Sequence, residues 1–168
     1  MKKQVSLKTY LLEKCLIGYG IINGIINAGI FYAMEAKHPD AMFAYPDAVI
    51  DISITTLLLG MILMYCALPL TLKDMNAGKF EVPKNAVNKI VAKLPKKKFL
   101  AALVIGLMTM AVAGGISALI AMVLPLPLTV KQMGIFKGVA CSIGGGIAGY
   151  LTINKAISDK QEVVNKAA

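Results

Sequence analysis

The sequence predicts an all-α membrane protein, a four-helix transmembrane bundle with both termini in the cytoplasm. Hydrophobic residues make up 57% of the 168 residues and the mean hydropathy is +0.69, both too high for an ordinary soluble domain. The apolar residues cluster in four blocks of about 20 to 26 residues, each long enough to cross a hydrocarbon core about 30 Å thick. A lysine-rich segment, 72–98, separates the second block from the third.

That segment sets the expected orientation. It holds eight lysines against two acidic residues, Asp74 and Glu81, and loops rich in Lys or Arg stay on the cytoplasmic side. Four spans with N-in and C-in topology place 15 of the 18 lysines in the cytoplasm. The three lysines expected outside are Lys37, Lys131 and Lys137.

Composition excludes several function classes. All 18 basic residues are lysine, so no arginine fork is available to bind phosphate or guanine through two hydrogen bonds. We therefore attribute the net charge of +9 to asymmetry across a bilayer and expect no nucleic-acid partner. The three cysteines lie in or beside apolar blocks, with no C-x-x-C and a single histidine in the chain. This pattern predicts no disulfide, metal or cofactor.

The first span is expected at about 15–34. Gly20, Gly24 and Ala28 are four residues apart, which places them on one helical face as a small-residue ridge for helix packing. Asn23 and Asn27 form a neighbouring stripe, and an amide in hydrocarbon is costly unless it is paired. The stripe is either an interhelical hydrogen-bond clamp or the polar lining of a solute path.

The second span is expected at about 49–70, with Asp51 near its outer end. This carboxylate either lies at headgroup level, favoured by water and the helix N-terminus, or acts as a cation or proton relay. Because the span has a single glycine, Gly60, we expect it to pack least tightly and to face lipid.

Within the lysine-rich segment, residues 82–94 predict a short amphipathic helix. Apolar residues recur at helical spacing, Pro83 suits a first helical position, and Pro95 marks the end. We expect this helix to lie on the anionic inner leaflet, with docking of a cytosolic partner as the alternative. The lysines assigned to either contact are Lys84, Lys89, Lys93, Lys96, Lys97 and Lys98.

The third span is expected at about 99–124. It is longer than a bilayer requires, so we expect it to tilt or bend, with Gly114–Gly115 as the bend point. The fourth span, about 133–153, is rich in glycine and is expected at the bundle centre or at a subunit interface. Its expected packing residues are Gly138, Gly145, Gly146 and Gly149, and Ser142 lies on the same face as Gly138.

One eight-residue pattern occurs twice, as LPLTLKDM at 68–75 and LPLTVKQM at 126–133, with six identical positions. Two copies on opposite sides of a membrane suggest an inverted repeat, the layout of many secondary transporters. The alternative is that this pattern is a convenient way to end an apolar helix.

The chain therefore reads as one membrane domain, 1–168, without the acid–base or metal chemistry of an enzyme. We expect a plasma (bacterial inner) membrane protein that conducts or transports a small solute or ion as a homo-oligomer. The alternative is a non-catalytic accessory, adaptor or immunity-type subunit that docks a membrane-protein partner through the lysine-rich segment. The candidate path-lining residues are Asn23, Asn27, Asp51 and Ser142.

Overall fold

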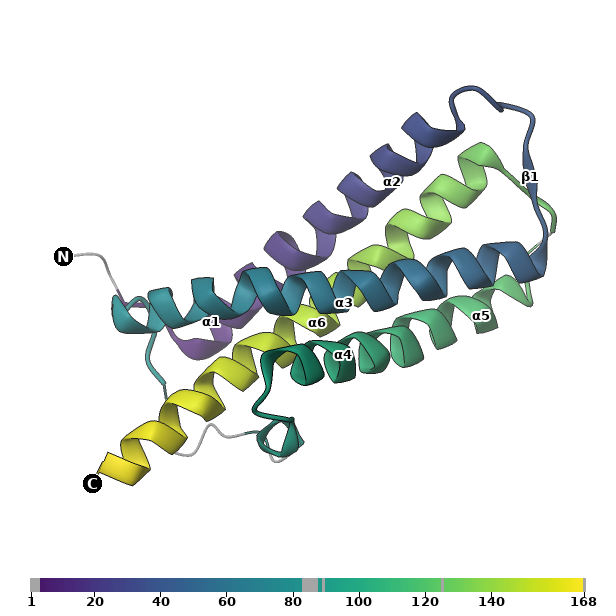
Figure 1. Cartoon of the computed structure of the whole chain (residues 1–168). Helices are drawn as coiled ribbons and strands as arrows, with labels where there is room; N and C mark the ends of the chain where they lie inside the picture. The colour runs from purple at the N-terminus through teal and green to yellow at the C-terminus, as the bar shows by residue number, and fades with distance from the viewer. Residues whose placement is uncertain (1–3, 83–87, 89, 125, 168) are drawn as a thin grey trace.

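The fold consists almost entirely of helix (Figure 1). It is seen in a computed structural model that describes residues 4–82, 88, 90–124 and 126–167, with side chains described to residue 164. Two series of helical segments are each continuous, and we call them the first helix (Leu7–Glu35) and the third helix (Lys98–Ala121). The elements in order are α1 (Leu7–Leu11), η1 (Leu12–Ile21), α2 (Ile22–Glu35), β1 (Met42–Phe43), α3 (Tyr45–Asn76), η2 (Val91–Lys93), α4 (Lys98–Thr109), η3 (Met110–Gly114), α5 (Gly115–Ala121), β2 (Leu128–Thr129) and α6 (Val130–Ala167).

Among the described residues, four helices are long and apolar enough to cross a membrane, as the sequence predicts: the first helix, α3, the third helix and α6. These helices fit a multi-pass membrane protein. Their bounds differ from the predicted spans because polar residues continue the helical hydrogen bonding past the apolar blocks. The second span was expected to end at residue 70, yet α3 continues through Pro69 to Asn76, and α6 extends well beyond residue 153. The third helix is shorter than expected and ends at Ala121.

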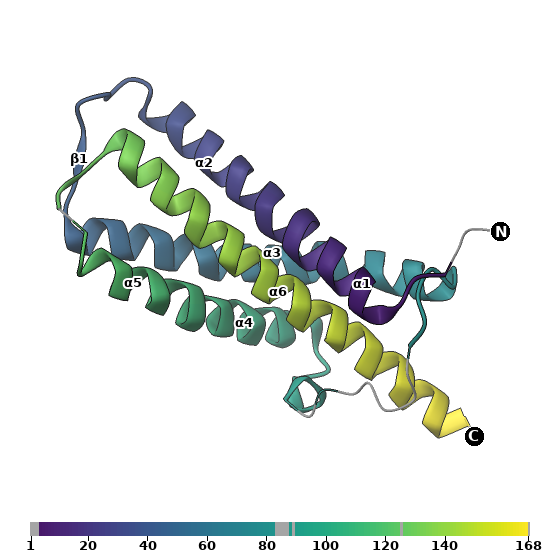
Figure 2. The same cartoon turned by 180° about the vertical axis from the view of Figure 1, so that it is seen from behind.

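The helices run alternately up and down the bundle (Figures 1 and 2). The start of the chain, the segment after α3 and the C-terminus lie at one end, which we call the lysine-rich end. The connections 36–44 and 122–129 lie at the opposite end. There β1 pairs antiparallel with β2, which ties the two connections together.

The glycine-rich α6 lies at the centre of the bundle and contacts the first helix, α3 and the third helix. In their most apolar stretches, 56% of residues are buried in α6, 33% in α3 and 17% in the first helix. The expectation that the second span is the one most exposed to lipid is therefore wrong. It failed because α3 packs with buried threonine and alanine, and its one glycine, Gly60, lies directly against Gly106 of α4.

The first helix and α6 approach so closely that side chains are excluded from part of their contact. The ridge of Gly20, Gly24 and Ala28 lies against Gly138 and Ser142 of α6. Three more glycines of α6 lie further along the same contact: Gly145, Gly146 and Gly149. A Cβ atom added at any of them would meet backbone or ring atoms of the first helix. Bare backbone brings many atoms into dispersion contact, which substitutes for the hydrophobic drive that lipid cannot supply.

The third helix changes its hydrogen bonding near its expected bend point. The segment η3 is π-helical and ends at Gly114, next to Gly115. A π-helical turn is a recognised cause of helix bending, so this irregularity coincides with the predicted position.

The two copies of the repeated pattern have different structures. The copy at 68–75 lies inside α3, whereas the copy at 126–133 includes β2 and the first turn of α6. The first copy forms the last turns of α3, which ends at Asn76, whereas the second copy follows the end of the third helix, so the two copies are not structurally equivalent. Similar sequence adopts two structures because the neighbouring residues determine whether the helix continues.

We expect Gly145→Ala to destabilise the bundle, because the added Cβ would overlap the carbonyl oxygen of Tyr19. Overpacking of this kind costs about 1–3 kcal/mol. Gly29→Ala is the matched control, since no atom lies within 4 Å of its added Cβ. Thermal unfolding in detergent, followed by circular dichroism, should show a lower Tm for Gly145→Ala only. An equal Tm in the two variants would contradict the close contact.

Candidate functional site

A charged pair joins α3 to α6 near the opposite end of the bundle. The Nζ atom of Lys137 donates to Oδ1 of Asp51 at 2.9 Å and lies 2.8 Å from its Oδ2. Asp51 is six residues into α3 and Lys137 is seven residues into α6, so both lie about 10 Å along their helices. We call this pair the α3–α6 ion pair.

The two partners differ in their exposure. The side chain of Lys137 is 12% exposed, whereas that of Asp51 is 39% exposed. The Lys137 ammonium also lies 5.3 Å from the ring centroid of Phe31 on the first helix, a cation–π contact. Around it is an apolar cluster that includes Ile52 and Met133. A covered ammonium among apolar side chains is costly without a counter-charge, which Asp51 supplies.

The sequence points to Asp51 but not to its partner. Lys137 is one of the three lysines expected on the outer side, although it falls within the fourth predicted span. The structure places it inside α6 and gives Asp51 a lysine rather than water alone as its partner. The available signal was a single lysine inside a glycine-rich apolar block, because ionisable residues are rare at such positions.

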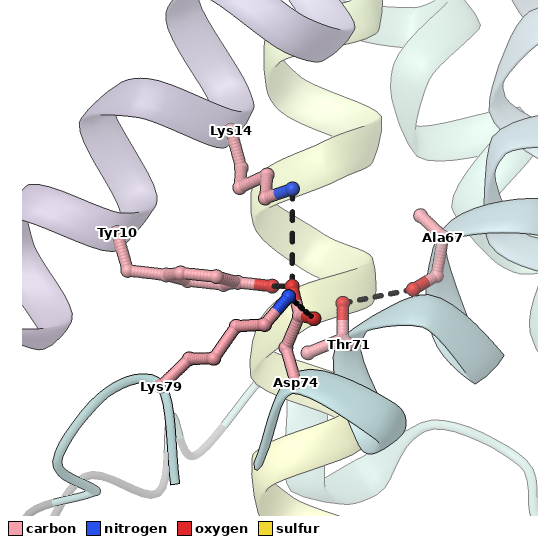
Figure 3. Close-up of polar contacts among 6 residues, drawn as sticks. All are labelled: Tyr10, Lys14, Ala67, Thr71, Asp74 and Lys79. Atoms are coloured by element: carbon pink, nitrogen blue, oxygen red, sulfur yellow. Dashed lines mark hydrogen bonds and ion pairs between the residues drawn. The ribbon is translucent and has the colours of Figure 1, made fainter. Parts of the chain in front are cut away.

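A second charged cluster lies at the lysine-rich end, centred on Asp74 of α3 (Figure 3). This residue is 7% exposed. The hydroxyl of Tyr10 donates to its Oδ2 at 3.0 Å, and Nζ of Lys79 donates to its Oδ1 at 2.5 Å. Lys14 adds a longer contact, with Nζ 3.8 Å from Oδ2. The cluster therefore connects the first helix, the end of α3 and the segment that follows it.

Backbone pairing reinforces this second cluster. Val5 donates its N–H to Lys79 and accepts from the N–H of Glu81, so the chain start pairs with the segment after α3. The ring of Tyr10 stacks on Phe80 with centroids 4.0 Å apart. These contacts hold the Tyr10 hydroxyl toward Asp74. The sequence alone does not predict this cluster, because its members are far apart in the chain; Tyr10 and Asp74, for example, are separated by 64 positions.

The other three candidate path-lining residues bond within their own helices. Asn23 donates to the carbonyl of Tyr19 and Asn27 to that of Asn23, both at 2.9 Å. Ser142 donates to the carbonyl of Gly138 at 3.0 Å. Bonding to a carbonyl four residues back satisfies a polar group in an apolar setting without a second helix. The expected interhelical clamp is therefore not formed by these bonds.

The lysines assigned to membrane or partner contact are only partly described. Lys84 and Lys89 lie outside the described residues, as do six of the thirteen residues of the expected amphipathic helix at 82–94. The described part of that segment contains the short 3-10 helix η2, with Val91 and Leu94 buried. Lys96 is exposed and pairs with Glu162 of α6 at 2.5 Å, and the other exposed lysines of this group are Lys93, Lys97 and Lys98.

The part of the chain described here contains no cluster of three or more His, Cys, Asp or Glu side chains able to hold a metal ion. The chain matches no protein-family model, and no curated protein or solved structure aligns with it. The function of this chain must therefore be inferred from its own geometry, in which the α3–α6 ion pair and the Asp74 cluster each join segments that are far apart in the sequence.

We expect Tyr10→Phe to loosen the lysine-rich end, because it removes the hydroxyl bond to Asp74 and keeps the ring that stacks on Phe80. A bond to a charged acceptor contributes roughly 1–3 kcal/mol. Hydrogen exchange should therefore quicken at the amides of Val5 and Glu81. Tyr65→Phe is the control, since Tyr65 is exposed on α3 and forms no hydrogen bond with another described residue. Unchanged exchange in Tyr10→Phe would contradict a structural role for this bond.

Proposed function

We propose that this chain conducts or transports a small cation or proton across the plasma (bacterial inner) membrane as a homo-oligomer. The single observation that carries the proposal is the α3–α6 ion pair. Ionisable residues inside membrane helices are costly, and they commonly mark ion pathways and proton relays. A buried ion pair is also weak evidence for stability alone, since apolar residues of similar volume often serve as well.

The exposure of the two partners indicates which solute they would bind. The side chain of Asp51 is the more exposed member, although its Oδ2 is buried, and the ammonium of Lys137 is covered by Phe31 and its apolar neighbours. A cation or proton arriving from the opposite end would meet Asp51 first and compete with Lys137 for it. Competition of this kind gives Asp51 two arrangements, one paired with Lys137 and one bound to the solute. Two such states are the minimum that a gated binding site requires.

The proposal of a homo-oligomer follows from how the bundle is filled. Because α6 occupies the centre and contacts the other three helices, one chain leaves little room for an enclosed path. The first helix has the least buried apolar stretch and is the surface we assign to contact between copies. The cytoplasmic position of the lysine-rich end, and so of both termini, is proposed from the excess of lysine there.

The second candidate function is a non-catalytic accessory or immunity-type subunit. The exposed lysines 93, 97 and 98, next to the Lys96–Glu162 pair, favour it as a docking surface. Native mass spectrometry of gently extracted protein distinguishes the two candidates. A discrete homo-oligomer supports conduction, whereas a single copy bound to a different polypeptide supports the accessory role.

We expect Asp51→Asn to reduce cation or proton flux by at least about tenfold, because it removes the charge that competes for the solute. Flux of protons, Na⁺ and K⁺ is measured in liposomes containing purified protein. Asp47→Asn is the matched control, since Asp47 carries the same charge in the exposed first turn of α3. Equal flux in the two variants would remove the α3–α6 ion pair from the mechanism.

A further inference from the structure

A groove of about 410 Å³ lies between η2 and the third helix at the lysine-rich end. Its floor is apolar and a lysine forms part of its wall. The lining residues are Ile90, Lys93, Leu94, Pro95, Val104 and Met108. Val104 and Met108 are six and ten residues beyond Lys98, the first residue of α4, so they lie about 9 and 15 Å along the helix. The groove therefore extends from the helix start toward the depth of the lipid tails.

Three exposed lysines lie at or near this groove in the chain. Lys93 lines it, Lys97 is the N-cap residue of α4, and Lys98 is the first residue of α4. None of the three forms an ion pair with another described residue. Lysine at a helix N-terminus is electrostatically unfavourable, and α4 has neither an acidic residue in its first turn nor a side-chain cap. An anion at this position would offset both deficits.

We propose that this groove binds one anionic phospholipid, with an acyl chain on Val104 and Met108 and the phosphate on Lys93, Lys97 and Lys98. The charge and the apolar floor are separated along the third helix in the order in which a phospholipid presents its headgroup and its tail. A cytosolic protein partner could contact the lysines, but its apolar groups would not reach along a helix that spans the membrane. The proposal requires a bilayer around the bundle and does not depend on cation flux.

The test is native mass spectrometry of the full chain in detergent with added phosphatidylglycerol or phosphatidylcholine. We expect the wild type to retain phosphatidylglycerol and to lose phosphatidylcholine. The triple variant Lys93→Gln/Lys97→Gln/Lys98→Gln should lower phosphatidylglycerol retention by about tenfold or more. The matched control removes the same charge from exposed lysines elsewhere: Lys37→Gln, Lys73→Gln and Lys131→Gln. Retention should survive in that control.

Two further variants test the apolar half of the site while the lysines stay in place. Val104→Phe fills the groove, and Ile90→Asn makes an exposed part of its wall polar without burying the amide. We expect both to weaken phosphatidylglycerol retention with a near-normal Tm. Equal retention of both lipids by the wild type would overturn the proposal. The proposal would also be overturned if the two triple variants lost phosphatidylglycerol equally, or if both groove variants retained it fully. A polypeptide bound to the wild type in place of the lipid would overturn it as well.

Discussion

The close approach of the first helix to α6 is the contact on which the other features depend. It requires bare backbone on α6, because the carbonyl of Tyr19 occupies the space where a side chain at Gly145 would lie. In lipid there is no hydrophobic force to hold two apolar helices together, so atomic proximity must supply the attraction. The first helix placed in this way brings Phe31 beside Lys137 and Tyr10 beside Asp74. One glycine-lined contact therefore positions an aromatic residue at each charged cluster.

The two charged clusters obey the same physical rule and differ in accessibility. A charge removed from water must be paired, and both Asp51 and Asp74 have a lysine within hydrogen-bonding distance. Asp74 is buried and its partners come from the first helix and from the segment after α3, which suits a structural latch at the lysine-rich end. Asp51 is partly exposed and its lysine is the covered partner, which suits exchange with a solute. This contrast is why we assign function to the α3–α6 ion pair.

Much of the architecture could be predicted from composition and periodicity alone. Four apolar blocks specify four helices, because backbone groups in lipid must be satisfied within a helix. The predicted small-residue faces of the first helix and α6 lie against each other, since glycine spacing marks where backbones can meet. The packing of α3 was not predictable from its glycine content, because threonine and alanine also permit close contact.

The site was harder to predict than the fold. Asp51 and Lys137 are 86 positions apart, so their pairing depends on the relative register of α3 and α6, which no local pattern encodes. For the amides of Asn23 and Asn27, a local pattern is present but does not predict the contact that forms. Their spacing suggests a shared purpose, yet each can bond to a carbonyl in its own helix, and spacing does not distinguish the two outcomes.

The most direct test of the central contact is a disulfide trap between Ala28→Cys and Gly138→Cys in an otherwise cysteine-free chain. A Cβ at position 138 would lie 3.1 Å from the Cβ of Ala28, so a disulfide, which spans about 3.5–4.5 Å between Cβ atoms, needs the two helices to separate by only a few tenths of an ångström. Oxidation in native membranes should give a cross-link within one chain, and Gly29→Cys with Gly138→Cys should give none. Absence of the first cross-link, or a covalent dimer in its place, would contradict the packing of the first helix on α6 of the same chain.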